Sequence, residues 1–162
     1  MDAIAYLQQQ HRDVEQLFAK LKEDDALEID KRRTLFLQLA DILSAHAAIE
    51  EERFYPACLT DDTEDLLREA VEEHLSVKRL LADLLDMEPS DERFQAAITT
   101  LEEQVSHHVG EEETELMPKI RKALGDDVLA ELGEELEVRF EELMNEEPHH
   151  RVFDELTEPA PI

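Results

Sequence analysis

The sequence has 162 residues, a formal net charge of −27 and a single cysteine, Cys58, so an internal disulfide is excluded. Such an excess of acid disfavours nucleic acids and anionic membranes as partners, because these usually bind clustered Lys and Arg. Only 5% of the residues are aromatic and only three are Gly, which favours helices over strands. No apolar run approaches a membrane span, and no signal peptide is recognisable, so we expect a cytoplasmic protein.

Apolar residues recur at spacings of three and four residues in five segments, as amphipathic helices require. These segments predict helices over residues 2–22, 30–55, 63–85, 91–124 and 127–144. The polar stretch 23–27 and the turns near Pro56 and Pro89 are expected to separate the first four helices. The sequence therefore predicts an all-α protein, an up-down-up-down four-helix bundle with an additional C-terminal amphipathic helix.

The expected domain organisation follows from these helices. Residues 1–125 form the four-helix bundle, and residues 126–144 form the helix that packs on the bundle or mediates association. Residues 145–162, which contain three prolines, are predicted to be an irregular acidic tail. His149 and His150 lie in this tail, where nothing fixes the geometry that a metal site needs. A monomer and a homodimer are both compatible with this pattern.

Two segments, His46–Pro56 and His108–Pro118, share a His-x-x-x-Glu motif that continues through acidic and apolar residues to a Pro. On a helix, positions i and i+4 lie on one face one turn apart. Each segment therefore directs an imidazole and a carboxylate to the same side, an arrangement typical of metal ligands.

One histidine lies on the apolar face of each of the first four predicted helices. Counted from the turns at about 1.5 Å per residue, the four histidines lie at a similar height in an up-down-up-down bundle. Their burial together with two carboxylates would be costly unless cations were bound there. We therefore predict that the metal ligands are His11, His46, Glu50, His74, His108 and Glu112. This mixture suits iron, manganese or zinc, and six ligands suit two metal ions about 3.5–4 Å apart.

The residues beside these ligands are expected to point elsewhere. His107 is about 100° from the inward stripe and is left outside the ligand set, although it could support a ligand. Tyr6 and Tyr55 are also left out. The neighbouring acids are predicted to be mostly solvated, although Glu51 or Glu111 could lean inward: Glu51, Glu52, Glu111 and Glu113.

The order of these motifs resembles the hemerythrin-like, or HHE cation-binding, family over about residues 1–125. The supporting features are a His on the first and third helices and His-x-x-x-Glu on the second and fourth. The resemblance implies two iron ions in a non-haem di-iron centre with an oxo or hydroxo bridge. It also implies that the protein binds or reacts with dioxygen, peroxide or nitric oxide, in sensing, buffering or protection against oxidative stress.

The sequence departs from the oxygen-carrying members at one position. Where these have a second histidine on the third helix, this chain has Lys78, which is a poor ligand while charged. Solvent, or an ion pair between Lys78 and a carboxylate of the site, is expected to replace that ligand. Glu112 also follows His108 by four residues instead of five. Both changes argue against reversible oxygen carriage, and a peroxide-removing, catalase-like enzyme and a metal-free helical interaction module remain as alternatives.

Overall fold

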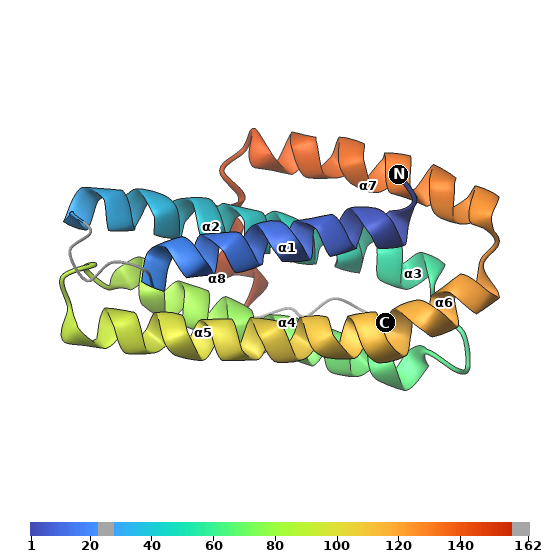
Figure 1. Ribbon diagram of the computed structural model, residues 1–162, viewed down its shortest axis with the longest axis horizontal. Helices are drawn as coiled ribbons and strands as arrows, with labels where there is room; N and C mark the ends of the chain where they lie inside the picture. Colours follow the sequence, from blue (N-terminus) through green and yellow to red (C-terminus); the bar gives the residue numbers. More distant parts are fainter. Residues whose placement is uncertain (23–27, 157–162) are drawn as a thin grey trace.

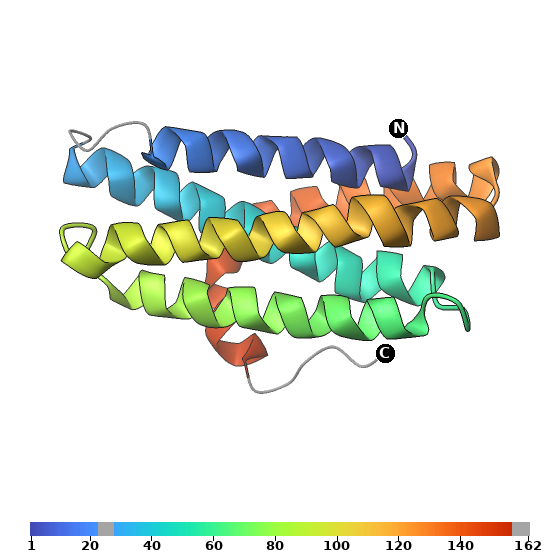
Figure 2. The ribbon, with the colours of Figure 1, turned by 60° about the horizontal axis from the view of Figure 1, so that its bottom comes forward.

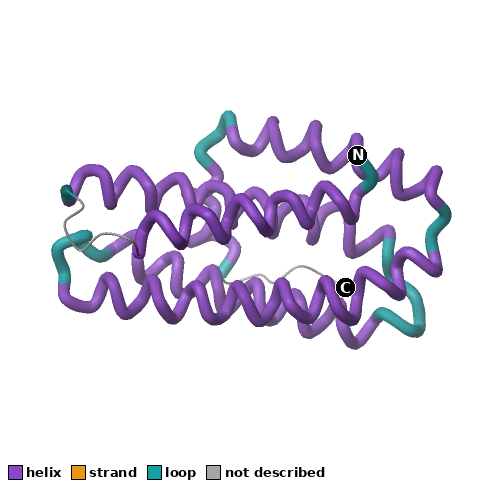
Figure 3. The backbone as a smooth tube through the Cα atoms, in the orientation of Figure 1, coloured by secondary structure: helices purple, strands orange, loops and turns teal. Residues whose placement is uncertain are grey.

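The computed structural model describes residues 1–22 and 28–156, and within these residues it contains helices and no strand (Figure 3). The helices in chain order are α1 (Ala3–Lys22), α2 (Ile29–Ile49), η1 (Glu50–Phe54), α3 (Tyr55–Ala57), α4 (Glu64–Asp86), α5 (Glu92–Glu111), η2 (Glu112–Leu116), α6 (Met117–Ala123), α7 (Asp126–Met144), η3 (Pro148–Arg151) and α8 (Val152–Glu155). The loop predicted at 23–27 lies outside the described residues.

Helices α1, α2, α4 and α5 run side by side and alternate in direction, which confirms the predicted all-α bundle (Figures 1 and 2). Their inward faces form two apolar clusters. On α1, Leu7 belongs to one cluster and Val14 to the other. The buried His11 lies between them in sequence. On α2, which runs in the opposite direction, His46 likewise lies between Leu43 of one cluster and Ile49 of the other. A buried polar layer therefore lies between two apolar ones.

Two π-helical turns, η1 and η2, extend α2 and α5. In each, a backbone N–H bonds the carbonyl five residues earlier: Tyr55 bonds Glu50, and Met117 bonds Glu112. A Pro follows directly in both cases, at 56 and 118, and cannot donate the next helical hydrogen bond. Such turns insert one extra residue and are frequent at functional sites.

Helix α7 lies against α1 and α2 (Figure 1). It buries one apolar stripe, whose members are Leu129, Leu132, Leu136 and Leu143. Gly133, in the same helix, faces the start of α1. Of the helices that the structure describes, none is long and apolar enough to cross a membrane.

The prediction of an irregular tail is wrong for residues 148–155, which form η3 and α8 against the bundle (Figure 2). Val152 is 1% exposed in one of the apolar clusters. The backbone N–H of His149 donates to Asp41 Oδ1 over 2.9 Å, and Glu155 forms an ion pair with Lys78. Segments this short carry no periodic pattern, and their order comes from contacts with distant residues. The rest of the predicted tail, 157–162, lies outside the described residues.

The close approach of α7 to α1 predicts the effect of Gly133→Ala. An added Cβ would overlap Met1 O and lie 2.9 Å from the backbone nitrogen of Ala3. Because both are backbone atoms, the helices must separate, and we expect a loss of about 1–3 kcal/mol in the free energy of unfolding. Urea denaturation measures this loss.

Gly110→Ala is the matched control, because a Cβ at this helical position would meet nothing within 4 Å. Ala is the better helix former, so this variant should be unchanged or gain up to about 1 kcal/mol. Equal stability of the two variants would contradict the packing described for α7.

Candidate metal centre

The four histidines predicted from the sequence meet in the centre of the bundle as two pairs. The ring centroids of His11 and His46 are 5.0 Å apart, and those of His74 and His108 are 4.6 Å apart. All four side chains are buried. Since each comes from a different long helix, the site depends on the assembled bundle.

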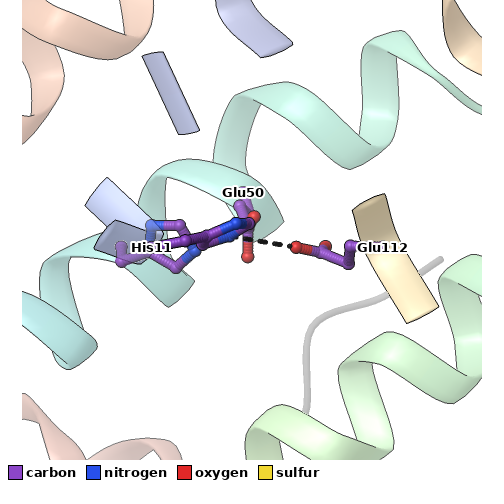
Figure 4. A group of neighbouring side chains, drawn as sticks. His11, Glu50 and Glu112 are labelled. Carbon is purple, nitrogen blue, oxygen red and sulfur yellow. Dashed lines mark ion pairs between the residues drawn. The ribbon is translucent and has the colours of Figure 1, made fainter. Parts of the chain in front are cut away.

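Glu50 and Glu112 lie between the two histidine pairs and are 0% and 2% exposed. The two oxygens of Glu50 face opposite pairs: Oε1 is 3.2 Å from His46 Nε2, and Oε2 is 3.0 Å from His74 Nε2. Glu112 Oε2 lies 3.5 Å from His11 Nε2 (Figure 4) and 3.6 Å from His108 Nε2. Both carboxylates therefore face the two pairs, as a bridging ligand would.

These six side chains form two groups of donor atoms that share Glu50. The first group contains His11, His46, Glu50 and Glu112, and the second contains Glu50, His74 and His108. Within each group the donor atoms all lie within 4.8 Å of one another, so each group could hold a metal ion.

Several of these donor atoms have no hydrogen-bond partner among the described residues. Four of them are buried donor atoms of the first group: His11 Nε2, His46 Nε2, Glu50 Oε1 and Glu112 Oε2. A buried polar atom without a partner costs about 1–3 kcal/mol. Coordination to a cation would satisfy all four atoms, so the residues present fit a metal.

The outer nitrogen of each imidazole in the first pair is held by another side chain. His11 Nδ1 lies 2.7 Å from Glu113 Oε1, and His46 Nδ1 lies 2.7 Å from Gln10 Oε1. Donation from Nδ1–H leaves the lone pair of Nε2 directed into the site, the tautomer that metal binding requires. Glu113 was expected to be solvated, but its side chain is 22% exposed and it also pairs with Arg12.

The second pair is supported from α4 and η1. His108 Nδ1 lies 3.1 Å from Glu73 Oε1, and His74 Nδ1 lies 3.7 Å from Glu51 Oε1. Glu51 leans inward, as the sequence left open, and its side chain is 9% exposed. The expected ion pair of Lys78 with a site carboxylate does not form, and Lys78 pairs instead with Glu51, over 2.9 Å, and with Glu155. Neither of these carboxylates belongs to the six-residue set.

The charges in the site shift the titration of its members. Burial lowers the pKa of His74, but hydrogen bonds and charge interactions with Glu50 and Glu51 outweigh it and raise the pKa to about 10. Burial raises the pKa of Glu50, yet the adjacent imidazoles of His46 and His74 hold it well below its usual range. Glu50 is therefore ionised, the form in which a carboxylate binds a cation.

Tyr55 belongs to this centre, although the sequence analysis left it out. Its buried hydroxyl lies 2.6 Å from Glu112 Oε1, 3.1 Å from Glu50 Oε2 and 3.2 Å from His74 Nε2. Burial and the two carboxylates raise its pKa well above 10, so the phenol keeps its proton. On an α-helix, residues five apart point about 140° from each other, but the π turn at η1 brings Glu50 and Tyr55 to one side. In the sequence, the Pro that follows each His-x-x-x-Glu motif was the one feature that could have indicated the π turn.

An apolar cavity of about 30 Å³ adjoins the centre. It is bordered by the four histidines and by side chains from all four long helices, among them Val14, Leu43, Val77 and Val105. This volume exceeds the roughly 10–15 Å³ that one water requires, so a molecule of two or a few atoms fits.

Two other histidine groups lie outside the centre. His107 is 66% exposed and faces Glu73 and Glu111 at the surface. The Nδ1 atom of His149 contacts Asp41 on α2. The structure thus separates these histidines from the six-residue set, as the sequence predicted.

The chain was compared with known proteins. The sequence model of the hemerythrin HHE cation binding domain matches residues 2–120. A DNA nickase from Nostoc sp. (strain PCC 7120) is 32% identical over 117 residues, which are 72% of this chain and 33% of that protein. The chain thus spans about a third of the length of this relative.

A solved structure is similar over nearly the entire chain. It is that of a hemerythrin HHE cation binding domain-containing protein from Mycobacterium kansasii. The TM-score is 0.79 at 25% sequence identity, covering 98% of this chain and 94% of that one. With the family match over residues 2–120, these findings show that the chain belongs to the hemerythrin HHE cation-binding family.

Proposed function

We propose that this protein binds two iron ions and uses them to bind a small molecule: dioxygen, peroxide or nitric oxide. The proposed ligands are His11, His46, Glu50, His74, His108 and Glu112. One histidine pair serves each metal ion, and the two carboxylates lie between the ions. Bound iron would supply redox chemistry and an open coordination position for the small molecule.

The observation that carries this proposal is the two groups of donor atoms that share Glu50. Six ligands exceed the four of a structural zinc site but can be divided between two ions bridged by carboxylate. The imidazole and carboxylate mixture favours iron, manganese or zinc over calcium and magnesium, which prefer oxygen ligands. Iron is the metal that the family resemblance implies.

The contacts around the site argue against a metal-free interaction module. A bundle that served only as a scaffold would gain stability from apolar side chains at these positions. Instead, the outer nitrogens of His11, His46 and His108 are held while their inner nitrogens converge. This arrangement costs stability without a cation and contributes affinity with one.

The cavity supports a small uncharged molecule as the second ligand. It adjoins all four histidines, and most of its other lining residues are Val and Leu. An apolar wall gives an anion no hydrogen bonds to replace its lost hydration, whereas dioxygen and nitric oxide have little hydration to lose. Hydrogen peroxide also fits the volume.

DNA nicking is not carried over from the Nostoc relative. The matched region is 33% of that protein, so its activity has no assigned place in the shared part. The net charge of −27 also repels the phosphates that a DNA-binding surface must neutralise. We therefore expect no salt-dependent binding of DNA.

Metal analysis tests the proposed function. We expect about two iron ions per chain in protein purified after growth with iron. His46→Ala and His108→Ala should each lose metal, because each removes one donor from a different group. His107→Ala and His149→Ala are the controls and should retain wild-type content, since neither residue belongs to these groups. Wild-type protein with far less than two metal ions per chain would contradict the proposal.

Tyr55→Phe tests the support of the carboxylates. Without the hydroxyl, Glu112 Oε1 loses its partner at 2.6 Å, and both carboxylates lose a restraint on their orientation. We expect the metal affinity to fall by roughly 10–100-fold, as for other residues that orient ligands. Competition with a chelator measures this change. Equal affinity in Tyr55→Phe and the wild type would refute the role of Tyr55.

A further inference from the structure

We propose that small uncharged molecules reach the metal centre through the groove between α1 and α5, past a gate formed by Val14, Val105 and Val109. This inference rests on the proposed function for the identity of the ligand. The route itself follows from two adjoining hollows and from what covers the other sides of the bundle.

The groove has a volume of about 80 Å³ and opens between α1 and α5. Four residues line both this groove and the inner cavity: His11, Val14, Val105 and Val109. His11 is one of the proposed ligands, so the three valines are the side chains that divide the groove from the cavity. Val109 is only partly buried. A rotation of its side chain is therefore the smallest movement that could connect the two spaces.

The other sides of the bundle are closed. Helix α7 covers α1 and α2 (Figure 1), while η3 packs on α2 and α8 on α4 (Figure 2). Helices α4 and α5 are joined at the level of the site by Ser76, which donates to Gln104, and by the contact of Glu73 with His108. The α1–α5 side has no added helix among the described residues, and it is crossed by ion pairs at the two ends of the groove.

Two ion pairs bracket the groove and hold α1 and α5 at a fixed separation. Lys22 pairs with Glu102 at one end over 2.9 Å, and Arg12 pairs with Glu113 at the other. The three gate valines lie between these pairs in sequence. The opening is thus a built feature of the bundle, with room for a valine to move.

The lining of the groove selects by charge and size. Phe18 and the valines make its walls apolar, while Glu15 and Glu102 place carboxylates along it. Both carboxylates are paired with cations, Glu15 with Arg12 and Glu102 with Lys22, and the apolar gate does not solvate any ion. Dioxygen, nitric oxide and hydrogen peroxide are small and uncharged, so they can pass.

Xenon exchange in the metal-free protein tests the route without depending on the metal. Xenon enters apolar cavities, and NMR of hyperpolarised xenon reports its exchange rate. Val109→Phe should slow exchange by roughly tenfold because a larger side chain must move aside, and Val109→Ala should accelerate it. Circular dichroism and thermal unfolding establish that both variants fold.

Val152→Ala is the control, because Val152 is the buried residue of α8, on the side that we describe as closed. It should leave the exchange rate unchanged. Unchanged exchange in both Val109 variants, or faster exchange in Val152→Ala alone, would overturn the proposal.

A second measurement uses iron-loaded protein and nitric oxide. Val109→Phe should slow both association and dissociation of nitric oxide, since its side chain divides the groove from the cavity. Equal rates in wild type and variant would contradict the route. If nitric oxide does not bind at all while xenon exchange responds as expected, the proposed ligand is wrong and the route stands.

Discussion

The structure is organised around the burial of six ionisable side chains between two apolar layers, which costs desolvation free energy. Glu50 is fully buried, and its charge is stable only because His46 and His74 face its two oxygens. The outer nitrogens of the imidazoles are held in turn by residues such as Gln10 and Glu113. With the contact of His108 to Glu73, three of the four rings are held while four inner donor atoms have no hydrogen-bond partner among the described residues. A bundle held together only by apolar contacts would be more stable without a metal, but it would offer no metal ligands.

The two halves of the centre are built alike but are not identical. Both carboxylates begin a π turn that ends before a Pro, so the same backbone device positions Glu50 and Glu112. Five residues later, however, one half has Tyr55 and the other Met117. Only the first half thus contributes a phenol to the centre, and this phenol contacts both carboxylates. The asymmetry would distinguish the two proposed metal positions chemically.

Helical periodicity and the placement of one histidine per helix were enough to predict the bundle and to select the six residues that converge. Tyr55 was missed because α-helical geometry directs it away from Glu50, and only the π turn reverses this. Glu113 was placed at the surface because its contact with His11 depends on how closely α1 and the end of α5 approach. The helical structure of residues 148–155 was missed for a similar reason, since Val152 and Glu155 contact residues far away in sequence. Side-chain contacts between elements are not encoded in the pattern of one element.

The most direct test of the account is anomalous diffraction at the iron edge from crystals grown with iron. The account predicts two peaks about 3.5–4 Å apart, at the level of Glu50 and Glu112 and each beside one histidine pair. A single peak there would contradict the sharing of the six ligands between two ions. Peaks only at the surface group of Glu73, His107 and Glu111, or no peak at all, would contradict the metal centre itself.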